Sequence, residues 1–183
     1  IELAHAARLV ADDHGDPPHW VPTDHYAAWL ALHTVEQWTV LVTAWLRLPR
    51  LASVADEKTQ VLSAERDRRA IPALRRQVLD LLASAPAGAS VTVDGLLSVL
   101  DDRQPRRSGE LRRLTAEATV REAGELGLLG AGALSTAGRL LLDDPGGTPA
   151  QRRSHEQRVG AALHDALPED LDHVLIQADL TVV

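Results

Sequence analysis

The sequence has 183 residues, enough for one ordinary domain or for two to three small ones. Hydrophobic residues make up 45% of it and charged residues 25%, which is typical of a folded globular chain rather than a disordered one. The absence of Cys excludes disulfides, thiolate metal ligands and thiol nucleophiles. The apolar runs are much shorter than the roughly 18 residues that cross a bilayer, and the start lacks the basic region of a signal peptide. We therefore expect a cytoplasmic or nucleoid-associated protein without membrane contact.

The net charge of −7 is unevenly distributed along the chain. Residues 1–65 carry a net charge of −5 and residues 114–183 a net charge of −6. Residues 66–113, by contrast, contain ten Arg against six acidic residues, a net charge of +4. A basic block inside an acidic protein favours a polyanion or an acidic partner at that block alone.

Residues 1–49 predict a helical subdomain. Residues 2–13 and 24–32 have the periodicity of short amphipathic helices. Thr34 stands three residues before Gln37, in the spacing of a capping box, and predicts the start of a longer helix that ends before Pro49. Trp residues in that helix have heptad spacing, which favours packing in a core over stacking on bases.

The middle of the chain predicts a winged helix. Residues 50–70 are charged and weakly periodic, and we interpret them as a linker. Residues 71–142 then follow the order helix, short strand, helix, turn, helix, hairpin, helix, which is the order of a winged helix. The β-branched triplet Val91–Val93 predicts the short strand, and Gly130–Gly132 predicts the hairpin turn.

Local signals define the ends of these elements. Asp94 and Ser135 are each expected to cap a helix, and the third helix is expected to end near Leu126. Residues 143–150 are rich in Gly and Pro and predict a second linker. Residues 151–183 predict a helix followed by a strand. The expected fold is therefore mainly α: a helical N-terminal subdomain and a winged helix with a short β-hairpin, followed by the start of an α/β domain.

The basic block concentrates its charge at the entry to the third helix of the winged helix. Five guanidinium groups are the candidate DNA-binding residues: Arg103, Arg106, Arg107, Arg112 and Arg113. The rest of that helix carries Glu117, Glu122 and Glu125, which would repel phosphates, and it has no Asn or Gln for reading adenine. We expect contacts with the DNA backbone rather than sequence readout. The alternative is a solvated Arg surface paired with acids of the same helix, such as Glu110.

Three stretches of the sequence carry a family resemblance: Arg121–Leu141, Leu167–Val183, and the region of Trp38 and Ala44–Leu46. Together they resemble the actinobacterial helicase-associated proteins, which carry a domain similar to the N-terminal domain of XPB-type DNA repair helicases. The resemblance covers most of the chain and is strongest after residue 115. It implies that the segment from residue 151 opens the XPB-like domain. It also implies a role in DNA repair or DNA metabolism beside a helicase, without an activity of the protein's own.

The sequence lacks the motifs of common enzymes. Its single Lys, Lys58, precedes Thr59, but Leu51–Glu57 contains no Gly, so there is no phosphate-binding loop for ATP. Ser135 does not stand in the Gly-x-Ser-x-Gly turn of a hydrolase. We therefore expect neither catalytic residues nor cofactors, and we interpret the chain as a protein that is not an enzyme.

Five His lie in the first 33 residues, close to several Asp. Asp12, Asp13, His14 and His19 could supply carboxylate and imidazole ligands to Zn²⁺ or Ni²⁺. Their spacing matches no familiar metal motif, so we expect solvated polar groups and no metal site. Two functions remain open from the sequence. The first is an accessory protein that binds DNA through its winged helix. The second is a protein-interaction module whose winged helix docks on a partner without touching DNA, with the Trp-rich first region as a candidate contact surface.

Overall fold

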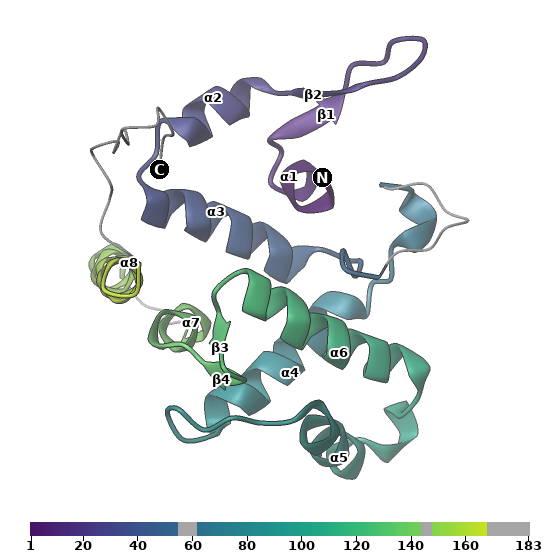
Figure 1. The fold of residues 1–183 in the computed structure, drawn as a ribbon, viewed down its shortest axis with the longest axis vertical. Coiled ribbons are helices and arrows are strands. Elements are labelled where there is room, and N and C mark those ends of the chain that lie inside the picture. Colours follow the sequence, from purple (N-terminus) through teal and green to yellow (C-terminus); the bar gives the residue numbers. More distant parts are fainter. Residues whose placement is uncertain (55–61, 144–147, 168–183) are drawn as a thin grey trace, which may run out of the picture.

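The structure, a computed structural model, describes residues 1–54, 62–143 and 148–167. Over these residues the protein is mainly helical, as predicted, with two small antiparallel hairpins (Figure 1). The helices are α1 (Glu2–Ala6), α2 (Asp24–Leu30), α3 (Thr34–Arg47), α4 (Ile71–Ser84), α5 (Val93–Arg103), α6 (Glu110–Glu125), α7 (Thr136–Leu142) and α8 (Pro149–His164). The strands are β1 (Val10–Asp12), β2 (Trp20–Pro22), β3 (Leu129–Gly130) and β4 (Ala133–Leu134). None of the described helices is long and apolar enough to span a membrane.

The first helix is shorter than predicted. It ends at Ala6 because Arg8 takes a left-handed conformation, with φ of 61°. The amide of Leu9 then donates to the carbonyl of Ala4 at 2.8 Å, and that of Arg8 donates to His5 at 2.9 Å. This is the Schellman pattern that closes a helix. The chain continues as β1, which pairs with β2, so the prediction of one helix over residues 2–13 was wrong.

The start of α3 lies close to the predicted position, with different capping residues. The N-cap is His33, whose amide donates to the Glu36 carboxylate at 3.0 Å. Gln37, expected to complete the capping box of Thr34, instead donates to the carbonyl of Trp29 at 3.2 Å. The end of α2 is thereby tied to the start of α3. The capping box is present one residue earlier than the sequence pattern suggested.

The order α4, α5, α6, β3, β4, α7 reproduces the predicted order of helices and hairpin. The strand predicted over Val91–Val93 is wrong, because Val93 already belongs to α5. The amide of Val91 donates to the carbonyl of Gly132 at 3.3 Å, which joins this segment to the hairpin without forming a strand. Thr92, rather than Asp94, caps α5 through a hydrogen bond from the amide of Gly95 at 3.1 Å.

The hairpin and the helix after it form as predicted. Leu129 pairs with Leu134 and Gly130 with Ala133, which leaves Ala131 and Gly132 as the turn. Both turn residues have positive φ, 50° and 78°, as a two-residue hairpin of this twist requires. The hydroxyl of Ser135 then accepts from the amide of Gly138 at 3.1 Å and caps α7.

Helix α3 shares a hydrophobic core with the helices that follow it. Val42 and Trp45 of α3 are fully buried in one cluster with side chains from α4 to α7. The other members include Val78, Leu79, Leu82, Leu96, Leu100, Ala116, Leu128, Leu134 and Leu142. Figure 1 shows α3 beside α4 and α6, which cross each other in this view. The helices of residues 1–49 and 71–142 therefore meet around a common core.

The described parts of residues 50–70 pack on the helices, and Leu51 forms a second small core with Ile71 and Ala118. Arg50 and Leu51 are buried, Arg50 pairs with Asp67, and Arg66 pairs with Glu2 of α1. At the other end, Thr148 caps α8, which starts two residues before the helix predicted from residue 151. The strand predicted from His173, and with it the stretch 168–183 that carries part of the family resemblance, lies outside the described residues.

Candidate nucleic-acid and protein interfaces

Arg112, one of the five candidate DNA-binding residues, faces the interior. Its side chain is 2% exposed. The guanidinium donates to the carbonyls of Leu100 at 3.0 Å and Gln104 at 3.1 Å, and to the carboxylate of Asp101 at 2.5 Å. These acceptors lie at the end of α5, where the carbonyl of Leu100 also accepts from the amide of Gln104 at 3.0 Å. Arg112 therefore joins α5 to α6, and its guanidinium cannot reach a phosphate on DNA.

Arg113 is exposed but already neutralised. Its guanidinium contacts the carboxylates of Glu110 and Glu117, each at 2.7 Å, one turn away on either side along α6. The hydrogen bond and charge of Glu110, followed by those of Glu117, raise the pKa of Arg113 above its ordinary value. This is the arrangement that the alternative interpretation of the Arg surface expected. One cation between two carboxylates offers little attraction to DNA.

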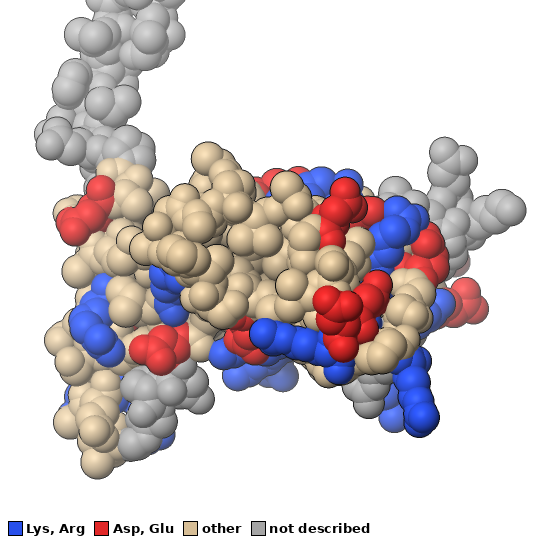
Figure 2. Space-filling view, turned by 90° about the horizontal axis from the view of Figure 1, so that it is seen from below, with Lys and Arg blue, Asp and Glu red and all other residues tan. Residues whose placement is uncertain are grey.

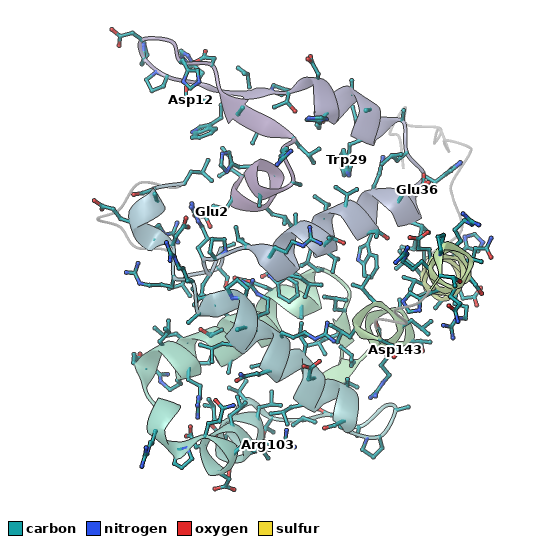
Figure 3. All side chains as sticks on the ribbon, turned by 180° about the vertical axis from the view of Figure 1, so that it is seen from behind. Glu2, Asp12, Trp29, Glu36, Arg103 and Asp143 are labelled. Atoms are coloured by element: carbon teal, nitrogen blue, oxygen red, sulfur yellow. The ribbon has the colours of Figure 1, made fainter. Side chains whose placement is uncertain are left out.

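The three remaining candidates lie at the turn between α5 and α6. Arg103 ends α5, and Arg106 lies in the 3₁₀ turn Pro105–Arg107; both are exposed, and neither forms an ion pair with a described residue. The side chain of Arg107 lies outside the described part of the structure. Figure 3 shows Arg103 at the end of the molecule farthest from the β1–β2 hairpin, where Asp12 is labelled. The structure thus retains Arg103 and Arg106 as accessible cations.

The charged residues around this end of the molecule are mixed in sign. Figure 2 looks at the molecule from the α5 end and shows Lys and Arg interspersed with Asp and Glu over the described residues of that face. The exposed charged side chains of α6 are three acids and two bases: Glu110, Arg113, Glu117, Arg121 and Glu125. The hairpin turn formed by Ala131 and Gly132 carries no charge. Helix α6 and the hairpin therefore present no net positive surface.

Glu122, expected from the sequence to repel phosphates, is instead a buried anchor. Its carboxylate accepts from the indole of Trp45 at 2.6 Å and from the amide and hydroxyl of Ser53 at 2.9 and 2.7 Å. The fully buried guanidinium of Arg75 lies 3.6 Å away. Burial lowers the pKa of Arg75 to about 10, and the charge of Glu122 opposes that shift. The expected repulsion by Glu122 was wrong, because its carboxylate does not reach the surface.

A second accessible surface lies on the outer side of α3, which we call the α3 groove. Its larger part is a hollow of about 640 Å³ between α1 and α3. This part is lined by Ala7, Arg8, Val40, Thr43, Ala44 and Arg47, among others. A smaller hollow of about 290 Å³ shares Ala7, Arg8 and Val40 and adds Trp29 and Leu32 of the α2 region. Figure 3 shows Trp29 between α2 and α3. The sequence predicts a contact surface in the Trp-rich first region, to which Trp29 belongs, but not a groove along α3.

The N-terminal His and Asp residues do not gather into a metal centre among the described residues. Asp13 accepts hydrogen bonds from the amides of His19 at 2.9 Å and Gly15 at 2.8 Å, and its second oxygen lies 3.3 Å from the His19 ring. The amide hydrogen bond from His19, followed by that from Gly15, lowers the pKa of Asp13. The carboxylate of Asp13 is therefore occupied in holding the loop between β1 and β2.

No protein-family model, curated protein or solved structure matches this chain. The resemblance to the actinobacterial helicase-associated proteins accordingly stays a prediction. What the surfaces can bind has to be inferred from their shape and charge. By that criterion the two candidates are the exposed cations at the turn between α5 and α6, and the α3 groove.

Proposed function

We propose that this chain is a non-catalytic protein-interaction module built on a winged-helix core. The order of helices and hairpin in residues 71–142 supports the winged-helix assignment. The observation that carries the functional part is the state of α6, the helix that would enter DNA. Arg112 is buried, and Arg113 lies between Glu110 and Glu117. A helix with this charge pattern suits a protein surface better than a phosphate backbone.

The α3 groove is the surface that we propose for the partner. Half-buried apolar side chains, including Val40 and Ala44, form its floor along one helix. Binding sites for peptide segments commonly combine an apolar groove with a polar rim. The resemblance to helicase-associated proteins favours a helicase as the partner and is our reason for proposing a role in DNA repair or DNA metabolism. The absence of a phosphate-binding loop supports a non-catalytic role.

Direct contact with the DNA backbone is the second candidate function. It is favoured by Arg103 and Arg106, which are exposed at the turn between α5 and α6. Each phosphate neutralised on duplex DNA contributes about −0.9 to the slope of log K against log salt. Two such residues predict a slope of about −2, which is a weak and sequence-independent interaction.

One NMR experiment separates the two functions. The ¹⁵N-labelled chain is titrated with a 20-base-pair duplex and, separately, with amphipathic helical peptides whose polar faces are acidic, neutral or basic. The proposed function expects peptide-dependent shifts at the amides of Val40, Thr43 and Ala44. Shifts at Arg103 and Arg106 on adding duplex, with none in the α3 groove for any peptide, would overturn it in favour of DNA contact.

Matched variants test whether Arg103 and Arg106 contact DNA. Arg103→Ala combined with Arg106→Ala removes the two accessible cations, whereas Arg113→Ala removes one that is already paired with two acids. In fluorescence anisotropy over 50 to 300 mM salt, backbone contact predicts that the first variant loses the salt slope and the second keeps it. Equal binding by all three chains would exclude the turn between α5 and α6 as a DNA contact.

A further inference from the structure

In the larger part of the α3 groove the acidic side chains are paired with Arg, whereas two further Arg side chains are not paired with a described acid. The two acids of this hollow are already engaged: Glu2 pairs with Arg66, and Asp67 pairs with Arg50. Two further Arg line the same hollow, at positions 8 and 47. Both are exposed, and neither forms an ion pair with a described residue. The charge left for a ligand in this groove is therefore positive.

Arg8 occupies its position at a conformational cost. A non-glycine residue in the left-handed region meets a steric penalty, and this position of a Schellman motif usually holds Gly. The carbonyl of Arg8 accepts a hydrogen bond from the Thr23 hydroxyl at 2.6 Å, a contact that any residue type could provide. The described contacts of the fold use only the backbone of Arg8, so its exposed guanidinium can pair with an external anionic group.

The spacing of the charged residues along the groove matches that of residues on a helical ligand. Arg47 follows Val40 by seven positions in α3, which corresponds to a rise of about 10 Å at 1.5 Å per residue. Arg8 and Val40 also line the smaller hollow, which Arg47 does not reach, so a cation lies near each end of this span. Two carboxylates placed seven residues apart on a ligand helix have about the same separation. Apolar residues between them would face Val40 and Ala44.

We propose that the α3 groove binds an acidic amphipathic helix of a partner protein, with Arg8 and Arg47 receiving its carboxylates. This inference rests on the proposed function and adds the chemistry of the ligand. The apolar floor supplies contact area, and the two cations supply selection for acidic sequences over neutral and basic ones. A nucleic acid fits this groove less well, because a phosphate backbone would leave the apolar floor uncovered.

The test uses three labelled 18-residue helical peptides that share the same apolar face. One carries Glu at two positions seven residues apart, the second carries Gln there and the third Lys. In fluorescence anisotropy at 50 mM salt, we expect the Glu peptide to bind at least tenfold more tightly than the Gln peptide and the Lys peptide to bind most weakly. We expect that preference to shrink at 500 mM salt as the charges are screened.

Variants assign the preference to the two cations. Arg8→Gly suits the left-handed backbone and so removes the charge without disturbing the helix end, and it is combined with Arg47→Gln. This double variant should bind the Glu and Gln peptides equally. The matched control, Arg103→Ala with Arg106→Ala, removes two exposed cations elsewhere and should keep the preference.

The outcomes separate this inference from the function on which it rests. Glu and Gln peptides that bind equally to the unmodified chain, while both shift the amides of Val40 and Ala44, would overturn the acidic ligand and leave a protein-docking groove. A preference for the Glu peptide that survives in the Arg8→Gly and Arg47→Gln variant would also overturn it. Groove amides that respond to none of the three peptides would overturn the proposed function itself.

Discussion

The indole N–H of Trp45 donates to the carboxylate of Glu122 at 2.6 Å and thereby joins α3 to α6 inside the core. The same carboxylate faces the buried guanidinium of Arg75, which in turn lies 4.8 Å from the centre of the Trp45 ring. Arg75 also donates to the carbonyls of Trp45 and Leu48 at the end of α3, at 2.7 and 2.8 Å. The buried ion pair thus supplies donors to the carbonyls at the end of α3 and holds α3 against α6.

Removing the carboxylate of Glu122 should destabilise the whole protein. Glu122→Ala leaves the Arg75 charge buried without its counter-ion, and breaking a buried pair in this way costs about 3–5 kcal/mol. Glu122→Gln keeps an oxygen for the Trp45 indole and should cost less. Urea unfolding followed by Trp fluorescence measures both. Glu125→Gln, on the exposed side of α6, is the matched control and should leave the midpoint unchanged.

Arg112→Ala should also destabilise the protein, by about 2–3 kcal/mol, because it removes the hydrogen bonds to the Asp101 carboxylate and to the carbonyls of Leu100 and Gln104 where α5 meets α6. Arg113→Ala is the matched control, because it removes the neighbouring Arg. It should leave the unfolding midpoint near that of the unmodified chain, since exposed ion pairs contribute little to stability. Circular dichroism in urea compares the two. Equal midpoints for both variants would contradict the structural role of Arg112.

Arg8→Gly should stabilise the fold by about 0.5–1 kcal/mol, because Gly adopts the left-handed conformation at this helix end without a steric penalty. Gly127 ends α6 with φ of 72°, and nothing lies within 4 Å of a Cβ placed on it. Gly127→Ala should therefore show the backbone effect alone, with the opposite sign and a cost of about 1 kcal/mol. Thermal unfolding by calorimetry should show shifts in opposite directions.

Gly138→Ala should destabilise α7 although helices ordinarily favour Ala. A Cβ at this position would lie 2.9 Å from the carbonyl oxygen of Leu128, so the helix has to move away from the hairpin at a cost of about 1–3 kcal/mol. Gly124, inside α6, has nothing within 4 Å of such a Cβ. Gly124→Ala should stabilise the fold by about 0.5–1 kcal/mol. A stabilising effect of both substitutions would argue against the packing of α7 on Leu128.

The loop between β1 and β2 should loosen in acid. The amide hydrogen bonds from His19 and Gly15 lower the pKa of Asp13 below its ordinary value of 3.8, so the carboxylate form is favoured in the folded loop. A lowered folded pKa means that the stabilisation is present above 3.8 and is lost as the pH falls through the folded pKa. Carboxyl ¹³C NMR of Asp13 should give a midpoint below 3.8, and the amide of His19 should shift with it.

Local sequence signals predicted the elements around the hairpin well. The Gly-rich turn, the cap at Ser135 and the end of the third helix near Leu126 are each encoded within a few neighbouring residues. The hairpin of β1 and β2 has no such signal, because its strands are short and the helix before it ends on Arg8 in place of Gly. The helix predicted from the sequence was therefore too long at its carboxyl end.

The candidate site was harder to predict because adjacent Arg residues have the same chemistry and opposite surroundings. Arg112 shares a side of α6 with Thr115, Ala116 and Thr119, which are all buried, whereas Arg113 lies one position round the helix. The helical phase of these small residues was a signal that could have placed Arg112 in the core. Arg75 offers the same lesson, since it lies within the apolar stripe of α4.

Helix α3 contributes to two parts of the molecule. Val42 and Trp45 pack in the core, and Val40 and Ala44 line the groove. A ligand that binds the outer side of α3 in the folded state alone must, by mass action, raise the free energy of unfolding of the whole fold. At a ligand concentration one hundred times Kd this linkage amounts to about 2.7 kcal/mol. A shift of the melting temperature would therefore report a natural partner of the groove without any label on either molecule.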